Sequence, residues 1–487
     1  MALASELGKR FKIAFVAEIA GVLAGGIMVV SLARLLDPDS YGLLFLAISI
    51  FSVARLFSVF GIPRSASRYL SEFKETDRGQ VPHILRISLI MNFLSVGVVT
   101  AVLVFGNKII SEFIGVPELS SFLSLGGFYI ISATITTYVR LTLQGLEKIE
   151  VASSFIALNQ IGRSLFSIGF VLFGFGAVGA LFGYILGYAL TAILGTLYMY
   201  KNIYSKIDPS PIESGLKMKI ARYSLPIAVT QSAHSLDHEI DRVLVGFFVG
   251  PTGVGFYTLG KQVVQFIETP MTALGFTLSP TYNAQKTKGN TETAARIYES
   301  TLSNGLLLYI PAAAGVILLA GPGIDLLFGS DYRGAVPVLQ ILAIFAVLKS
   351  IVKVTSDGLD FLGRARERAY LKGGTALLNI ILNIALIPIL GVIGAALATV
   401  VTYSIYTFGN LVIMVNEIQF DYVKVLKNSG YATVITAVMS LIVFLTRGLI
   451  SNIISLVGVI FLGVAVWMIL VISTGMIDAR RVIKLVE

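Results

Sequence analysis

Residues 452–475 read NIISLVGVIFLGVAVWMILVISTG, 24 positions without an acidic or basic side chain. A helix of about 20 apolar residues crosses the roughly 30 Å of hydrocarbon in a bilayer, so this stretch predicts a transmembrane helix. The sequence as a whole predicts an all-α integral membrane protein with about 14 such helices. We expect them at 11–34, 41–62, 83–107, 119–139, 150–174, 176–199, 220–247, 252–279, 298–320, 334–361, 369–389, 391–414, 429–446 and 452–475.

The composition agrees with a membrane protein and argues against an enzyme. Apolar residues make up 55% of the chain and charged residues 13%, against about 25% charged in soluble proteins. The absence of cysteine removes disulfides, thiolate chemistry and cysteine metal sites. No phosphate-binding GxxxxGK[ST] loop and no catalytic constellation is present. We therefore predict a transporter without a resident cofactor.

The basic residues are distributed unevenly between alternate loops. Of the 37 lysines and arginines, 26 fall at the termini and in every second loop, 4 in the other loops and 7 within spans. The positive-inside rule then places both termini in the cytoplasm, in a multi-pass protein of the plasma membrane. The net charge of +9 is explained by loops that face anionic lipid headgroups, so it does not indicate nucleic-acid binding.

A pattern recurs at a nearly constant spacing. Residues 38–42 and 251–255 share the form Pro-x-x-x-Gly at an offset of 213, and residues 176–180 and 391–395 share Gly-x-x-Gly-Ala at an offset of 215. This predicts two six-helix lobes, 1–200 and 201–415, followed by a helix pair at 416–487. Because both lobes begin on the same side, the repeat is parallel, as in transporters whose halves rock about a central site. The alternative is that both patterns are common packing sequences of membrane helices.

Several motifs, taken in order along the chain, resemble those of a known family. Residues 377–388 (LLNIILNIALIP) and 391–399 (GVIGAALAT) resemble the eleventh and twelfth helices of polysaccharide flippases. Residues 68–72, 224–226, 241–242, 255–257 and 363–366 are similar to the same family. These flippases belong to the MOP exporter superfamily, with the O-antigen flippases, the lipid II flippase and the MATE drug exporters.

The resemblance implies both a fold and a function. It implies a MATE-like fold that moves an oligosaccharide linked to polyprenyl or dolichyl (pyro)phosphate from the cytoplasmic to the outer leaflet by alternating access. Such a flippase serves surface polysaccharide or glycoprotein biosynthesis, with glycosyltransferases or a polymerase of the same pathway as partners. By analogy with the lipid II flippase, the apolar pair 429–446 and 452–475 forms a groove for the lipid tail.

Charged residues inside spans are costly, so each marks a candidate transport path. A phosphate is best held by arginine or lysine in a low-dielectric cavity. The predicted headgroup-binding set is Arg55, Arg163, Lys261, Lys349 and Lys353, with the polar cavity residues Gln160, Gln262, Gln265 and Glu268. Lys261 leads this set because Leu259-Gly260-Lys261 resembles the position of a basic cavity residue in the lipid II flippase. The alternative for each cation is an interhelical ion pair, for example between Arg55 and Glu268.

A second polar cluster lies on the seventh span. His234 and His238 are four residues apart, as are Asp237 and Asp241, so both pairs recur at the helical spacing. We predict ion coupling here, to a proton or sodium gradient, since histidine titrates near neutral pH. The alternatives are a metal site and a hydrated face paired with basic neighbours.

Two rival functions remain open at the level of sequence. One is a MATE-like, cation-coupled exporter of small drugs or metabolites, for which acidic cavities are expected. The other is a membrane scaffold for a glycan synthesis complex that transports nothing. The basic residues of the fifth and tenth spans argue against the first, and charged stripes on several helices argue against the second.

Overall fold

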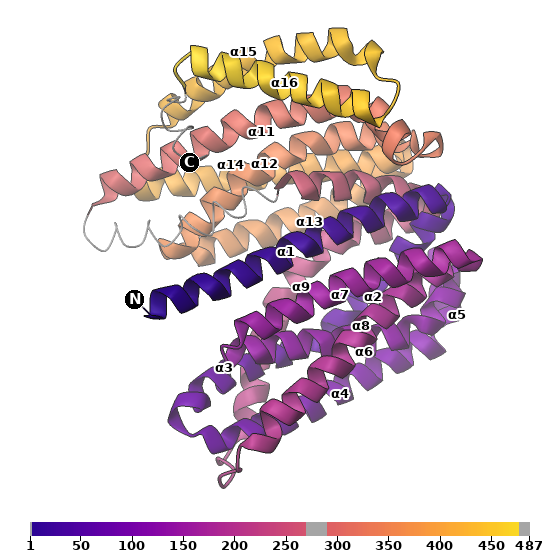
Figure 1. The fold of residues 1–487 in the computed structure, drawn as a ribbon, viewed down its shortest axis with the longest axis vertical. Coiled ribbons are helices and arrows are strands. Elements are labelled where there is room, and N and C mark those ends of the chain that lie inside the picture. The colour runs from indigo at the N-terminus through magenta and orange to yellow at the C-terminus, as the bar shows by residue number, and fades with distance from the viewer. Residues whose placement is uncertain (1, 269–289, 477–487) are drawn as a thin grey trace. The chain divides into compact units, whose positions relative to one another are not determined.

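The computed structural model describes residues 2–268 and 290–476, apart from the side chains of residues 2–18, 229, 230, 232–238 and 361. All regular secondary structure in these residues is helical (Figure 1). The α-helices are α1 (Ala2–Leu35), α2 (Pro38–Val59), α3 (Ile62–Thr76), α4 (Val81–Phe105), α5 (Asn107–Ile114), α6 (Leu119–Gly145), α7 (Ile149–Phe170), α8 (Gly176–Asn202), α9 (Leu216–Phe248), α11 (Thr291–Leu327), α12 (Ala335–Phe361), α13 (Ala365–Leu390), α14 (Val392–Ile418), α15 (Tyr422–Thr446) and α16 (Ile453–Ser473). Residues 251–268 are also helical.

The prediction of an all-helical membrane protein is confirmed. Over its described part, each predicted span coincides with a helix; residues 269–279 of the eighth span lie outside the described residues. Within the described ranges, ten stretches are long and apolar enough to cross a membrane, and one of them, Ile149–Lys206, contains both α7 and α8. A shorter apolar stretch, Ile19–Leu35, lies in α1. The short helices α3 and α5 were not predicted.

Helix ends follow local sequence chemistry. Asp37 caps α2 by accepting hydrogen bonds from the backbone N–H groups of Asp39 and Ser40, each at 3.0 Å, and Pro38 supplies the first helical position. The apolar helix α16 begins with a capping box between Asn452 and Ser455. Such caps satisfy backbone donors that have no partner within the helix.

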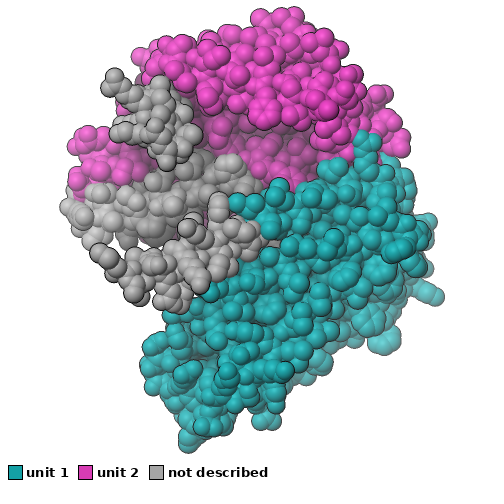
Figure 2. All heavy atoms as spheres, in the orientation of Figure 1, with its two compact units in different colours: residues 1–255 teal, residues 256–487 magenta. Residues whose placement is uncertain are grey.

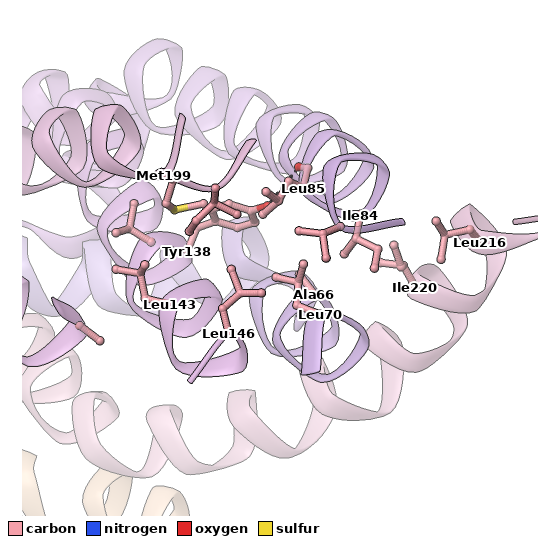
Figure 3. Packing of buried hydrophobic residues seen from close by; sticks show 14 residues of the cluster. Ala66, Leu70, Ile84, Leu85, Tyr138, Leu143, Leu146, Met199, Leu216 and Ile220 are labelled. Atoms are coloured by element: carbon pink, nitrogen blue, oxygen red, sulfur yellow. Dashed lines mark hydrogen bonds between the residues drawn. The ribbon is translucent and has the colours of Figure 1, made fainter. Parts of the chain in front are cut away.

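The chain divides into two compact units, residues 1–255 and 256–487, coloured separately in Figure 2. In unit 1, α3, α4, α6, α8 and α9 bring together a cluster of buried apolar side chains (Figure 3). Leu70, Ile84, Leu143 and Ile220 in this cluster are fully buried. Helix α3 is too short to span a bilayer, and it is held here by its apolar face while its charged face stays exposed.

Unit 2 has its own apolar core. Helices α11, α12 and α14 pack around Tyr298, Leu359 and Met414. Helices α15 and α16 lie side by side and pack on α11, and Met439, Val443 and Val459 form a small cluster between them (Figure 1). The apolar helix pair predicted at the end of the chain therefore contacts the rest of unit 2 through α11.

Backbone geometry supports the internal repeat. Helices α6 and α12 have 27 residues each and begin at Leu119 and Ala335, an offset of 216. Further on, Gly176 and Gly391 adopt nearly the same positive φ, 56° and 59°, at an offset of 215. The offset changes because α7 continues into a π turn, Val171–Phe175: its 22 residues and the five of the turn correspond to 26 in α13. Gly174 within this turn has a φ of 88°, so the helix is interrupted there before α8 begins at Gly176.

The two copies of the Pro-x-x-x-Gly pattern meet within unit 1. A Cβ on Gly42 would lie 1.7 Å from the carbonyl oxygen of Pro251, and a Cβ on Gly255 would lie 2.5 Å from that of Pro38. Thr252 donates a hydrogen bond of 2.8 Å to the Asp39 carboxylate, which is 213 positions earlier. Each copy thus contacts its equivalent reciprocally, as expected about a pseudo-twofold axis. The lobe boundaries predicted at 200 and 415 stay a prediction.

Candidate functional site

The most distinctive polar group in unit 1 is Arg163, near the middle of the helix formed by α7 and its π turn. Its guanidinium carbon lies 4.9 Å from the ring centroid of Tyr188 and 5.2 Å from that of Tyr184, both on α8. Its Nη1 donates to the Tyr188 hydroxyl at 3.2 Å, and its Nη2 donates to Gln160. Its Nε is buried without an acceptor. Among the described residues, no carboxylate contacts Arg163.

Arg55 belongs to the same neighbourhood. It lies on α2, half-buried, and its charge interacts with the hydroxyls of Tyr129 and Tyr188, as does that of Arg163. Within the described part of the chain, Arg55 likewise has no carboxylate partner. Two arginines therefore act on the same tyrosines, and no described carboxylate contacts either arginine.

A neutralised cation lies near the same tyrosines, since the charge of Arg242 interacts with Tyr184. Arg242 of α9 pairs with Glu239 at 2.8 Å, and the same carboxylate oxygen accepts from Ser49 of α2 at 2.8 Å. The adjacent Asp241 is 1% exposed. The side chains of His234, Asp237 and His238 lie outside the described residues, so the predicted ion-coupling cluster is represented here by Asp241.

In unit 2 the predicted lysines are paired with carboxylates. Lys349 contacts Glu268 at 2.8 Å, with both side chains about one-fifth exposed. Lys353 contacts Asp357 at 3.0 Å on the same helix, α12. Lys349 thus has a partner on another helix, as in the interhelical ion-pair alternative, whereas Lys353 pairs within its own helix.

The remaining predicted cavity residues lie on the helix at 251–268 and are Lys261, Gln262 and Gln265. Lys261 lies over the ring of Tyr257 at 5.1 Å and also interacts with Glu268. Gln262 is half-buried and Gln265 is exposed. The structure therefore groups Lys261, Glu268 and Lys349 in unit 2, and Arg163, Gln160 and Arg55 in unit 1. Among the described side chains, no group of three His, Cys, Asp or Glu is placed to hold a metal ion.

An apolar cavity of about 320 Å³ lies within unit 2. Its walls come mainly from α11, α15 and α16, and include Pro311, Gly315, Val443, Val459 and Trp467. The Trp467 indole Nε1 has no acceptor there. A cavity of this kind suits a hydrocarbon chain rather than a charged group.

Sequence reasoning missed the tyrosines around Arg163. Tyr184 and Tyr188 are four residues apart and so share one face of α8, which is the signal that a search for charged residues passed over. Because aromatic residues are common in apolar helices, their role shows only once Arg163 is placed on their rings.

Comparison with known proteins identifies the family. Residues 7–282, more than half of the chain, match the family model described as polysaccharide biosynthesis protein, and residues 226–385 match the MatE model. The chain belongs to the polysaccharide biosynthesis protein family. Its relatives include membrane flippases and transporters, and it belongs with these rather than with enzymes.

Two archaeal relatives cover most of this polysaccharide biosynthesis protein. An uncharacterized membrane protein of Methanocaldococcus jannaschii is 26% identical over 78% of this chain and 92% of its own length. A probable low-salt glycan biosynthesis flippase of Haloferax volcanii is 23% identical over 93% of both chains.

Solved structures confirm the fold of this family member. A lipid II flippase in an inward closed conformation superposes with a TM-score of 0.77 at 16% identity, covering 95% of this chain and 98% of its own. An inward-facing MATE multidrug transporter of the MOP superfamily gives a TM-score of 0.64 at 16% identity, covering 82% of this chain and 98% of its own. The predicted MATE-like fold is therefore confirmed.

Proposed function

We propose that this protein is a flippase that moves a lipid-linked glycan, attached through a phosphate or pyrophosphate, from the cytoplasmic to the outer leaflet by alternating access. The observation that carries the proposal is Arg163, a cation inside an apolar helix bundle whose described contacts are tyrosines and a glutamine. An uncompensated charge at this depth is costly, so a function that requires an anion explains its presence.

The same observation weighs against export of cationic drugs through this part of unit 1. A cationic substrate would be repelled by both Arg163 and Arg55, and no described carboxylate contacts either of them. Phosphate oxygens, by contrast, accept charge-assisted hydrogen bonds from guanidinium groups in two-point geometry. The hydroxyls of Tyr129 and Tyr188 and the amide of Gln160 add donors and acceptors of the kind that sugar hydroxyls need.

The apolar cavity in unit 2 supports a substrate with a long hydrocarbon chain. It is lined mainly by three helices, and the side chains that line it are apolar apart from the Trp467 N–H. A polyprenyl or dolichyl chain has no polar atoms beyond its phosphate end, so such walls match it. Three relatives named as flippases, two from Haloferax volcanii and the lipid II flippase of Bacillus subtilis, are consistent with this substrate class.

Further parts of the proposal rest on the sequence. The excess of basic residues in alternate loops supports a plasma-membrane protein with both termini in the cytoplasm. Lys261, Lys349 and Lys353 complete the proposed headgroup-binding set. The cluster at His234, Asp237, His238 and Asp241 is proposed to couple transport to a proton or sodium gradient. Glycosyltransferases or a polymerase of the pathway are the proposed partners.

A transport assay tests the proposal directly. The full-length protein is reconstituted in vesicles that contain polyprenyl-pyrophosphate N-acetylglucosamine, and a galactosyltransferase added outside modifies the sugars in the outer leaflet. We expect protein-containing vesicles to be labelled completely and protein-free vesicles only in the outer leaflet. Arg163→Gln should slow labelling by about 10- to 100-fold, the effect of losing one charged hydrogen bond of about 1.5–3 kcal/mol.

Two controls make the result specific. Arg333→Gln removes an exposed arginine that pairs with Asp325 outside the proposed site, and should leave labelling unchanged. Arg163→Lys keeps the charge but loses the planar fork and should give an intermediate rate. If wild-type vesicles show no more labelling than protein-free vesicles while a cationic dye is transported, the drug-exporter function replaces the proposal.

A further inference from the structure

The two units contain equivalent aromatic pairs. In unit 1 the rings of Tyr129 (α6) and Tyr188 (α8) lie 5.4 Å apart at 78°, and in unit 2 those of Phe345 (α12) and Tyr403 (α14) lie 4.5 Å apart at 84°. Tyr129 and Phe345 are 216 positions apart, and Tyr188 and Tyr403 are 215 apart. These are the offsets of the helices themselves on either side of the π turn, so the pairs occupy equivalent places in the repeat.

Each pair carries a cation from the preceding helix. In unit 1, Arg163 of α7 lies over Tyr184 and Tyr188 of α8. In unit 2, Lys372 of α13 lies over Tyr403 and Tyr406 of α14, at 4.6 and 5.0 Å from the ring centroids. Position 372 does not correspond to position 163 in the repeat. The cation over the tyrosine rings therefore comes from a different turn of α13 than the turn equivalent to that of Arg163 in α7.

Burial is also matched between the pairs. Tyr129 and Phe345 are 3% and 4% exposed, whereas Tyr188 and Tyr403 are half-buried. In each unit the cation therefore lies over the more accessible ring, where a ligand could reach it. A second lysine, Lys349, lies 5.2 Å from the ring of Phe345, but its charge is paired with Glu268, so Lys372 is the cation of the unit 2 site.

We propose that unit 2 contains a second phosphate-binding site, formed by Lys372, Tyr403 and Tyr406 and equivalent to the site at Arg163. The inference rests on the proposed function, because it assigns the same class of ligand, the phosphate or pyrophosphate of a lipid carrier. A lysine ammonium has three donors, so it can contact ring faces and still donate to phosphate oxygens. As a point charge without a planar fork, it binds phosphate with less directional selectivity than Arg163 does.

Counting bound ligands tests this inference. The full chain in mild detergent is incubated with farnesyl pyrophosphate, and native mass spectrometry measures how many molecules remain bound. We expect two per wild-type chain, one for Lys372→Met, one for Arg163→Gln and none for the double variant. Tyr403→Leu, which keeps the lysine but removes the accessible ring, should also bind one.

The chain offers a matched control. Lys148 lies over the ring of Tyr198 at 5.5 Å, outside both aromatic pairs, so Lys148→Met should still bind two. Binding of two by Lys372→Met, folded as judged by a wild-type melting temperature, would overturn the second site. One molecule on wild type, lost in Arg163→Gln and kept in Lys372→Met, would overturn the second site and leave the proposed function standing. No binding to wild type would contradict both.

Discussion

Arg163 and Lys349 illustrate two ways of holding a cation among apolar helices. Lys349 has its own carboxylate, Glu268, so its charge is neutralised within the protein. The described contacts of Arg163 are rings, a hydroxyl and an amide, and none of these neutralises its charge. Guanidinium suits the second role because it is weakly hydrated, stacks on aromatic faces and stays protonated.

The pairing of Lys349 with Glu268 leads to a stability prediction. Glu268→Gln leaves a partly buried lysine without its carboxylate and should lower the free energy of unfolding by about 3 kcal/mol. Replacing both partners, as Glu268→Gln with Lys349→Met, should recover part of that loss, because Lys349 no longer leaves an unpaired charge while Lys261 still lacks its interaction with Glu268. Thermal unfolding in detergent measures both variants. Equal melting temperatures for wild type and Glu268→Gln would show that the ion pair contributes nothing to stability.

For single residues, the sequence predicted which charged side chains lie within membrane spans. It did not predict which side chains they contact. Lys261 and Glu268 were both predicted as polar residues of the span 252–279. The pairing of Glu268 with Lys349 depends on how helix 251–268 packs on α12, and the ring contacts of Arg163 depend on how α7 packs on α8. Contacts between side chains of different helices are not encoded in a hydropathy pattern.

Helices α11, α15 and α16 enclose the apolar cavity through side chains that leave space unfilled. Gly315 is one of the lining residues, and a Cβ placed there would meet no atom within 4 Å. The glycine thus keeps the cavity open on the α11 side. Space of this kind accepts an apolar ligand because it offers water few polar partners.

A bulky side chain placed in the cavity should compete with a lipid tail for the same space. Gly315→Phe places a ring in the open space without displacing backbone, so the fold should persist. We expect at least a tenfold slower labelling in the vesicle assay, with an unchanged melting temperature. Gly97→Phe is the matched control, because Gly97 also faces open space but lies on α4. Wild-type labelling by Gly315→Phe would mean that the tail does not occupy this cavity.

The segment between α8 and α9 is fastened to the end of α3 by side-chain hydrogen bonds. Gln80, which is 2% exposed, donates to the Ser210 hydroxyl at 2.8 Å and to the Pro211 carbonyl at 2.7 Å, and accepts from the backbone N–H of Glu213 at 3.0 Å. Asp77 accepts from both Gln80 and Ser210 at 3.1 Å. These bonds, led by the one from Gln80, hold the pKa of Asp77 below its ordinary value of 3.8.

This arrangement predicts a pH dependence. A lowered pKa in the folded state means that the Asp77 bonds are fully present above the ordinary value and are lost as the pH falls through the lower one. Hydrogen exchange at residues 208–213, corrected for intrinsic rates, should be slow above about pH 5 and should accelerate below it. Asp77→Asn should remove that pH step. A step of the same size in both proteins would assign it to another group.

Element boundaries were predicted closely where a helix is long and uninterrupted in hydropathy. Predicted spans 119–139 and 391–414 begin within one residue of α6 and α14. Helix α3 was missed because its charged face breaks the apolar run that identifies a span. The π turn was missed because one extra residue changes the repeat offset without changing composition.

The contact between the two Pro-x-x-x-Gly segments, residues 38–42 and 251–255, leads to a stability prediction. Gly42→Ala places a methyl group within 1.7 Å of the Pro251 carbonyl oxygen, so the backbone at the start of α2 must move. We expect a lower melting temperature and a similar effect from Gly255→Ala, whose Cβ would meet the Pro38 carbonyl oxygen. Gly97→Ala, with open space around it, should match wild type. Full stability of Gly42→Ala would show that the copies are not packed against each other as described.

Among the described residues no carboxylate contacts Arg163, and this has an electrical consequence. A membrane potential performs work of about 2.3 kcal/mol on each unit charge moved through 100 mV. In a flippase, a phosphate bound at Arg163 cancels that charge, so the loaded protein carries little net charge through the field. The empty protein returns with the cation exposed to the field. A cytoplasm-negative voltage would then favour the empty inward-facing form. It would thus drive the return of the empty protein to the state that binds the next substrate.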